Sequence, residues 1–235
     1  MKAVVLAAGR GTRLRPWTET LPKVMIPVGG KPPLERHIER LRAAGIEDIF
    51  INLHHLPEAI SGRFGDGERW GVRIRYAYEP ELLGTAGAVK NLERDLAGGP
   101  FLVVYRDNTV DVDYADFSRF AEAGDALGIV AVFEKDDVAG AGIVDFAPDG
   151  RIARFLEKPE PGAAFSRWVN AGIYRFGPRL FDYLKPGFSD FGKDVFPLLL
   201  ERGETLLAYV LKDPVVAVDT PDQLRAATRA AGGSS

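Results

Sequence analysis

Apolar residues along the chain follow two alternating patterns, which together predict an α/β protein. Short apolar or alternating runs of strand length cover residues 1–6, 46–53, 72–78, 101–105, 127–133 and 206–211. Between two of these runs, Leu34, Ile38 and Leu41 recur at helical spacing, and Gly45 ends the stripe. Further helices are predicted over residues 57–64, 84–96, 177–184 and 194–200, and from residue 221 onward. This alternation of strand and helix predicts βαβ units and a mostly parallel sheet.

Turn residues change the pattern in the second half of the chain. A Pro-Asp-Gly turn at residues 148–150 separates two short runs at 142–146 and 151–156, which predicts an antiparallel hairpin. Residues 186–193 predict a loop that could fold over a ligand. Near the C-terminus one more strand ends before Thr220, which we expect to be the N-cap of the last helix.

Composition excludes several classes of function. The chain has 235 residues, 46% of them hydrophobic, which suits one large α/β domain or two small ones. A net charge of −3 gives no basic field for nucleic acid, and the lack of cysteine excludes disulfide frameworks and thiolate metal sites. No apolar run approaches the roughly 20 residues of a membrane span, and no signal peptide is recognisable. We therefore expect a cytoplasmic protein that binds neither nucleic acid nor membrane.

The most informative stretch follows the first apolar run. It consists of Leu6, Ala7, Ala8, Gly9, Arg10, Gly11, Thr12 and Arg13. Gly9 and Gly11 would let the backbone approach a ligand and adopt positive φ. Arg13, together with Lys23 further along, would donate charge-assisted hydrogen bonds to phosphate oxygens. A buried strand followed by exposed N–H groups and fixed positive charge suits a polyphosphate; the alternative is an ordinary glycine-rich turn.

Two better-known glycine loops do not fit this stretch. The dinucleotide-binding fingerprint requires a third glycine where Leu14 stands, and the P-loop requires Gly-Lys-Ser or Gly-Lys-Thr. An oxidoreductase that uses a nicotinamide cofactor is therefore disfavoured.

Other polar residues suggest a metal site with differing strength. Asp107 would lie at the carboxyl end of a central strand, where a carboxylate suits Mg²⁺, although Asp is also common at strand ends. Asp111 and Asp113 are assigned to the following turn. His54 and His55 lack further ligands at metal-binding spacing, so we interpret them as a loop pair.

The segment from Leu6 to Pro16, followed by Pro22 and Lys23, resembles the signature of the sugar-1-phosphate nucleotidylyltransferases. In that family the loop wraps a nucleoside triphosphate, and the residues that match Arg13 and Lys23 hold its phosphates. The resemblance covers essentially the whole chain.

The resemblance implies a single Rossmann-like α/β domain over residues 1–231, with a mostly parallel central sheet and a small antiparallel sugar-binding subdomain. The nucleotide-binding half would cover about 1–112 and the sugar-phosphate-binding half about 113–231. Residues 232–235 would form a flexible tail.

Residues 83–88 have the sequence Leu-Gly-Thr-Ala-Gly-Ala and include Gly84 and Thr85. They resemble the family element that contacts the base and ribose. Glu79 lies five residues before Gly84, where some uridylyl- and thymidylyltransferases carry a base-reading glutamine. A carboxylate only accepts hydrogen bonds, and guanine offers adjacent N1–H and N2–H₂ donors. Glu79 therefore favours a guanine nucleotide.

Two later motifs resemble the sugar-phosphate half of the family site. By that resemblance Glu157 and Asn170 bond sugar hydroxyls, Lys158 meets the phosphate, and Gly142 lets the backbone lie near the sugar.

The family's second metal-binding aspartate corresponds here to Asp219, although its position is shifted by comparison with many relatives. Together with Asp107 it would hold Mg²⁺. Arg106 precedes Asp107 where the family usually has glycine, which is a departure from the pattern.

The implied reaction joins a nucleoside triphosphate and a sugar 1-phosphate and releases pyrophosphate, with Arg13, Lys23 and Asp107 as catalytic residues. The run at residues 83–88 most resembles enzymes that use GTP and a manno- or heptose-type sugar phosphate. Two alternatives stay open: UTP, dTTP or CTP with another sugar or small phosphorylated acceptor, and a catalytically silent nucleotide-sugar-binding regulatory module, which Arg106 and the shifted Asp219 favour. Whether the chain forms a homo-oligomer also stays open.

Overall fold

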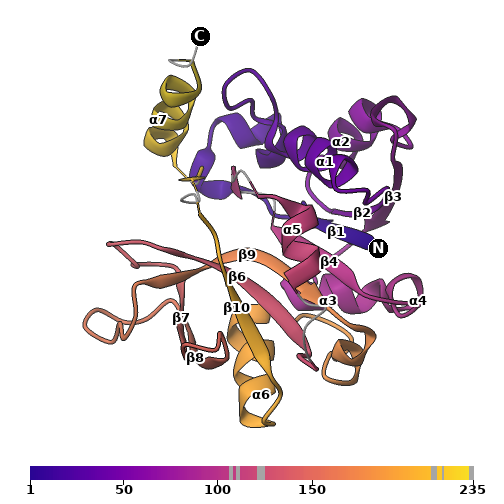
Figure 1. The fold of residues 1–235 in the computed structure, drawn as a ribbon. Helices are drawn as coiled ribbons and strands as arrows, with labels where there is room; N and C mark the ends of the chain where they lie inside the picture. The colour runs from indigo at the N-terminus through magenta and orange to yellow at the C-terminus, as the bar shows by residue number, and fades with distance from the viewer. Residues whose placement is uncertain (106–107, 110–111, 121–124, 213–215, 219, 233–235) are drawn as a thin grey trace. The chain divides into compact units, whose positions relative to one another are not determined.

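The computed structural model describes residues 1–105, 108–109, 112–120, 125–212, 216–218 and 220–232 (Figure 1). Three residues with sequence-based predictions, Arg106, Asp107 and Asp219, lie outside this described part. The chain divides into two units. Unit 1 comprises Met1–Leu82, Val104–Tyr114 and Val215–Ser235, and unit 2 comprises Leu83–Val103 and Ala115–Pro214.

Unit 1 is built on three parallel strands, β1 (Lys2–Leu6), β2 (Asp48–Leu53) and β3 (Arg73–Tyr78), in the order β1-β2-β3. The register pairs Leu6 with Asn52 and Asn52 with Ala77, so the carboxyl ends of all three strands lie side by side. Ligands of parallel α/β sheets bind at this end of the strands. The loop after β1 therefore begins where a ligand is expected.

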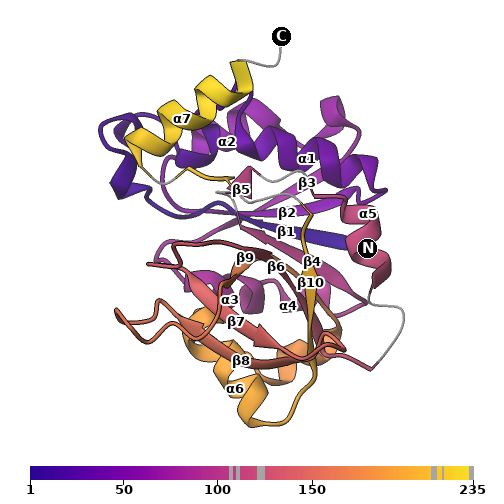
Figure 2. The same ribbon diagram turned by 60° about the vertical axis from the view of Figure 1, so that its left-hand side comes forward.

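Helices α1 (Pro33–Ala43) and α2 (Pro57–Phe64) lie on the same side of these strands (Figures 1 and 2). Leu34, Ile38 and Leu41 of α1 are fully buried, which confirms the predicted apolar stripe. Short 3₁₀ turns cover Thr12–Leu14, Trp17–Glu19, Lys23–Met25 and Glu68–Trp70.

The last elements of unit 1 come from distant parts of the chain. Strand β5 (Asn108–Thr109) pairs antiparallel with β11 (Val216–Ala217), and α7 (Pro221–Gly232) follows. The N–H of Thr220 donates to Oε1 of Gln223 at 3.1 Å, and the N–H of Gln223 donates to Oγ1 of Thr220 at 3.3 Å. These reciprocal bonds form a capping box, which confirms Thr220 as the N-cap.

Unit 2 contains the antiparallel part of the fold. Its elements are α3 (Gly84–Asn91), α4 (Glu93–Leu96), most of β4 (Phe101–Tyr105) and α5 (Tyr114–Arg119), β6 (Gly128–Glu134), β7 (Gly142–Phe146), β8 (Ile152–Glu157), β9 (Trp168–Phe176), α6 (Phe196–Glu201) and β10 (Leu206–Val210). β10 is parallel to β6, whereas β9 is antiparallel to β6 and pairs with the β7–β8 hairpin.

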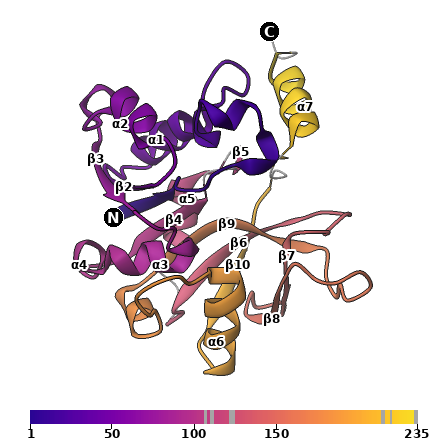
Figure 3. The ribbon, with the colours of Figure 1, turned by 180° about the vertical axis from the view of Figure 1, so that it is seen from behind.

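An aromatic cluster forms much of the core of unit 2, where α6 lies beside β8 (Figure 3). The rings of Phe155 and Phe196 are 4.7 Å apart between their centroids, and those of Phe176 and Phe191 are stacked at 5.4 Å. Tyr174 also packs edge-on against Phe196. The predicted hairpin and the predicted mixed α/β class with a mostly parallel sheet are confirmed.

Three predicted elements differ in detail from the structure. The helix predicted over residues 84–96 is interrupted at Leu92, whose N–H bonds to Val89 in a tighter turn. The helix predicted over 177–184 is a 3₁₀ turn, Pro178–Asp182. The predicted loop 186–193 ends early, because Asp190 caps a π-helical turn, Phe191–Val195, by accepting from the N–H groups of Gly192 and Lys193.

Across the described stretches of chain, every helix is too short or too polar to cross a bilayer.

Candidate functional site

The loop after β1 combines a buried start with a surface turn. Ala7 and Ala8 are buried, whereas Arg10, Thr12 and Arg13 are exposed. The turn therefore offers cationic side chains and backbone at the carboxyl end of a buried strand, as the sequence predicts.

Gly11 and Lys23 lie together in this loop. Gly11 has a φ of 62°, a left-handed conformation that favours glycine. A Cβ at this position would lie 2.9 Å from Cγ2 of Thr18 and 3.1 Å from Cβ of Lys23. The absence of a side chain at Gly11 therefore allows Lys23 to pack against the loop. Positive φ is confirmed for Gly11, but Gly9 is not among the described glycines that adopt it.

A buried chain of hydrogen bonds starts from the same loop. The N–H of Ala7 donates to Oδ1 of Asn52 at 2.6 Å, and Nδ2 of Asn52 donates to Oε1 of Glu79 at 2.8 Å. Asn52 and Glu79 are only 3% and 1% exposed. The carboxyl group of Glu79 is thus turned into unit 1. Sequence reasoning missed Asn52, although a polar residue within an apolar strand run was the available signal.

His54 and His55 are hydrogen-bonded to the surroundings of the loop. Nδ1 of His54 is 2.8 Å from the carbonyl oxygen of Glu79, and Nε2 of His55 is 2.7 Å from that of Thr18. Oγ1 of Thr18 in turn donates to the carbonyl of Gly11 at 3.0 Å. No group of three metal-ligating side chains occurs among the residues described, and each histidine contacts a carbonyl instead.

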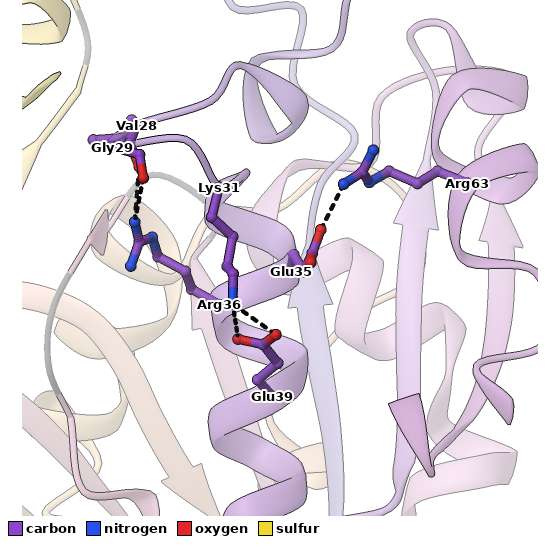
Figure 4. Close-up of polar contacts among 7 residues, drawn as sticks. All are labelled: Val28, Gly29, Lys31, Glu35, Arg36, Glu39 and Arg63. Carbon is purple, nitrogen blue, oxygen red and sulfur yellow. Dashed lines mark hydrogen bonds and ion pairs between the residues drawn. The ribbon is translucent and has the colours of Figure 1, made fainter. Parts of the chain in front are cut away.

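The segment after Lys23 is attached to α1 by polar contacts (Figure 4). Nη2 of Arg36 donates to the carbonyl of Val28 at 2.8 Å, and Nζ of Lys31 contacts both carboxylate oxygens of Glu39 at 2.7 and 2.8 Å. An apolar cluster lies on the other side of this segment and consists of Leu14, Ile26, Val28, Val218, Leu224 and Ala227. The loop that carries Lys23 is therefore fixed by both α1 and α7.

The segments next to the two predicted metal ligands are paired. Asn108 of β5 is in register with Ala217 of β11, and Thr109 with Val216. Asp107 directly precedes this pairing and Asp219 follows it by two residues in the sequence.

Gly84 and Thr85 lie at the start of α3 in unit 2, where residues 187–191 pack against them. The N–H groups of Ala86 and Gly87 donate to the carbonyl of Ser189 at 3.0 and 3.2 Å. A Cβ on Gly84, whose φ is 72°, would collide with that carbonyl.

The hydroxyl group of Thr85 has two partners within unit 2. It donates to Oδ2 of Asp190 at 3.0 Å and accepts from the N–H of Phe191 at 2.9 Å. Both hydrogen-bonding functions of this side chain are thus used inside the protein.

Glu157 lies between two glycines at the end of β8. A Cβ on Gly142 would be 2.6 Å from Oε2 of Glu157, and one on Gly192 would collide with the same oxygen. Burial raises the pKa of the Glu157 carboxyl, and the charge of Asp190 raises it further, while Lys158 and Lys193 act in the opposite direction. The resulting carboxyl group is partly buried and in close contact with backbone.

Lys158 follows Glu157 with an unusual backbone. Its φ is 51°, which is uncommon for a residue with a side chain, and its N–H donates to the carbonyl of Ala141 at 3.1 Å. The exposed Nζ lies 3.9 Å from Oε1 of Glu157. Strained backbone of this kind is typical of functional sites.

Asn170 lies at an irregularity of β9. Its Oδ1 accepts from the N–H of Gly172 at 2.9 Å, and its Nδ2 donates to the hydroxyl of Tyr174 at 2.8 Å. The register of β9 with β6 shifts between Val130 and Val132 of β6, and Gly172 of β9 has a φ of 67°. This β-bulge fixes the amide of Asn170 in one orientation.

Comparison with known proteins gives consistent similarities. A family model described as "Nucleotidyl transferase" matches residues 2–223. The UTP–glucose-1-phosphate uridylyltransferase of Synechocystis sp. is 37% identical over 217 residues, which are 86% of this chain and 56% of that protein. The mannose-1-phosphate guanyltransferase of Schizosaccharomyces pombe is 35% identical over 206 residues, 85% of this chain and 56% of that protein. The chain spans about half the length of these relatives.

A solved structure has the same fold. It is a putative glucose-1-phosphate thymidylyltransferase from Bacillus anthracis in complex with a sucrose, with a TM-score of 0.89 and 25% identity. The alignment covers 98% of this chain and 95% of that chain.

Proposed function

We propose that this chain, which belongs to the nucleotidyl transferase family, transfers a nucleotidyl group from a nucleoside triphosphate to a sugar 1-phosphate and releases pyrophosphate. The observation that carries the proposal is the contact of Gly11 with Lys23 at the end of a buried strand. It combines an open backbone turn with fixed positive charge, which is what a triphosphate requires.

The proposed chemistry is an in-line displacement at the α-phosphorus. An oxygen of the sugar phosphate forms the new P–O bond, and the bond from the α-phosphorus to the bridging oxygen breaks, so pyrophosphate leaves. No general base is needed, because a phosphate monoester has its second pKa at about 6 and is mostly a dianion at pH 7. Two unit like charges 4 Å apart repel by about 4 kcal/mol at an effective dielectric constant of 20. Arg13, Lys23 and Lys158 would offset this repulsion.

We assign the sugar phosphate to residues of unit 2. Glu157 accepts hydrogen bonds from sugar hydroxyls, Asn170 bonds a further hydroxyl, and Lys158 meets the phosphate. The closeness of Glu157 to Gly142 and Gly192, which keeps side chains away from its carboxyl group, supports this assignment.

A divalent ion, which we take to be Mg²⁺, completes the proposal. Carboxylate oxygens of Asp107 and Asp219 suit a hard cation, and the pairing of Asn108 with Ala217 supports a common site. Bound there, the ion would neutralise charge on the triphosphate.

The proposed nucleotide is GTP or UTP. Burial of Glu79 against Asn52 weakens the argument for guanine that rests on a free carboxylate. The choice of nucleotide then rests on the two relatives. One is named a UTP–glucose-1-phosphate uridylyltransferase and the other a mannose-1-phosphate guanyltransferase.

The test is pyrophosphate release over a matrix of GTP, UTP, dTTP and CTP against glucose, mannose and heptose 1-phosphates. We expect release for at least one pair. The test variant is Lys23→Met, which keeps an apolar stem of similar length but removes the charge. We expect it to lower turnover by about 10²-fold or more. Nucleotide binding without release for any pair would instead support a regulatory module.

A further inference from the structure

We propose that residues 52–55 are a positioning segment for the triphosphate loop, and that Glu79 acts on the nucleotide through Asn52 instead of contacting the base. The proposal deepens the proposed function and rests on it for the identity of the ligand, a nucleoside triphosphate. It assigns a role to five polar side chains that the reaction itself does not use, those of Thr18, Asn52, His54, His55 and Glu79.

The first connection reaches the loop at Ala7. Asn52 is in register with Leu6, the last residue of β1, so its amide lies directly beside the start of the loop. Its oxygen accepts from the N–H of Ala7 at 2.6 Å and its nitrogen donates to Glu79 at 2.8 Å. Glu79 therefore fixes the orientation of the Asn52 amide. The amide oxygen must face the N–H of Ala7, and the amide nitrogen must face the carboxylate of Glu79.

The second connection reaches the loop at Gly11. A carbonyl oxygen only accepts, so Nε2 of His55 donates to the carbonyl of Thr18 at 2.7 Å. Thr18 is 2% exposed, and its hydroxyl donates to the carbonyl of Gly11 at 3.0 Å. Thr18 thus links His55 to Gly11. The loop is thus attached to the end of β2 on both sides of Gly9 and Arg10.

Glu79 is held at three points, which leaves it little freedom to follow a base. Its side chain accepts from Asn52, its N–H donates to the carbonyl of Leu53 at 2.8 Å, and its own carbonyl lies 2.8 Å from Nδ1 of His54. At 1% exposure its carboxyl group does not present a surface to a ligand.

Pre-organisation of a binding loop lowers the free-energy cost of ordering it when the ligand binds. The phosphates are common to every nucleotide, so loss of either connection should weaken all nucleoside triphosphates alike. If Glu79 contacted the base directly, the opposite would be expected, because substitution of Glu79 would change the preference between GTP and UTP.

The experiment compares four variants in full-length protein. Asn52→Leu removes the first connection and His55→Phe removes the second. Glu79→Gln keeps a carbonyl oxygen that can accept from Asn52. Tyr114→Phe is the matched control, because it removes another buried side-chain hydrogen bond of unit 1, between the hydroxyl of Tyr114 and Nδ1 of His37 at 2.9 Å. The readouts are the KM for GTP and for UTP, the KM for the sugar phosphate, and nucleotide affinity by calorimetry.

We expect Asn52→Leu and His55→Phe each to raise the KM for both nucleotides by about ten-fold, the effect of losing about one hydrogen bond. The KM for the sugar phosphate should stay within about two-fold, and Tyr114→Phe should leave every KM near that of the unaltered protein. Glu79→Gln should leave the ratio of GTP to UTP use within about two-fold.

Two results would overturn the proposal. One is a shift of the GTP to UTP ratio by more than about ten-fold in Glu79→Gln, which would mean direct contact with the base. The other is a KM in both Asn52→Leu and His55→Phe that matches the Tyr114→Phe control. If the unaltered protein releases no pyrophosphate, the proposed function fails, but calorimetry with the same nucleotides still decides this inference.

Discussion

At the scale of single residues, two glycines determine the surroundings of Glu157. Gly142 and Gly192 come so close to Oε2 that any side chain on either would displace the carboxyl group. This closeness removes water from Glu157, and burial is the main cause of its raised pKa. Burial of the ionised Glu157 carboxylate, a group suited to accept hydrogen bonds from sugar hydroxyls, therefore lowers the free energy of unfolding at neutral pH.

We predict that Glu157→Gln raises Tm at pH 7 while it weakens sugar 1-phosphate binding. The folded-state pKa lies above the ordinary value of 4.5, so the folded state favours the protonated carboxyl group. Its stabilising contribution is present below pH 4.5 and is lost as pH rises through the raised pKa. The gain in Tm should therefore shrink as pH is lowered toward about 4. Thermal unfolding of both proteins from pH 4 to 8 checks this, and a lower Tm for the variant at pH 7 would contradict it.

The sequence predicted the backbone of the loop after β1 better than the side chains that surround it. The positive φ of Gly11 was predicted because a local motif and the chemistry of glycine specify it. Asn52 was missed and the burial of Glu79 was not expected, because both depend on side chains that meet across three strands. Spacing along the chain does not reveal which polar residues are brought together by parallel pairing.

At the scale of elements, the start of α3 is joined to residues 187–191. The carbonyl of Ser189 accepts from the N–H groups of Ala86 and Gly87, two of the four N–H groups in the first turn of the helix that have no partner within it. Those groups are therefore not available to a phosphate. The predicted loop 186–193 is instead the N-terminal cap of α3 and, through Asp190, of the following helical turn.

We predict that Thr85→Val loosens this junction. Valine has nearly the shape of threonine but can neither donate to Asp190 nor accept from the N–H of Phe191. The cost should be about 1–3 kcal/mol of the free energy of unfolding, typical of leaving buried polar groups without a partner. Hydrogen exchange should accelerate at the amides of residues 189–193. Thr85→Ser, which keeps the hydroxyl group, is the control, and equal exchange in both variants would refute the role of the hydroxyl.

Most strands were predictable from the sequence, whereas the kinds of helical turn were not. Apolar runs placed most strands to within one or two residues, because burial requires apolar side chains in any sheet. Strands β5 and β9 were not predicted. The helix expected from residue 194 instead begins with a π turn at Phe191, because Asp190 captures the N–H groups of Gly192 and Lys193. Such capping depends on where one short side chain points.

At the scale of the whole molecule, the two predicted metal ligands come from opposite halves of the chain. The strands next to them in the sequence, β5 and β11, pair in unit 1 although many elements of unit 2 separate them in the sequence. The effect of Arg106, which stands where the family usually has glycine, and the metal-binding role of Asp219 stay predictions, because both residues lie outside the described part of the chain.

We predict that Asp107→Asn and Asp219→Asn each lower turnover by about 10²-fold or more, the usual effect of removing one electrostatic stabiliser. If both hold one ion, the double variant should be scarcely slower than either single variant, because residues that act as a unit are not additive. Excess EDTA should stop pyrophosphate release by the unaltered protein. A loss of turnover in the double variant equal to the product of the two single losses would argue against a shared ion.

The apolar cluster around Leu14 has a consequence for biosynthesis. Leu14, Ile26 and Val28 leave the ribosome long before their partners Val218, Leu224 and Ala227 are made. The nascent chain therefore exposes the apolar side chains of the loop after β1 until residues 218–227 have been made. A premature stop before residue 218 would yield a protein that retains the signature motif but lacks the apolar contacts that hold it in shape.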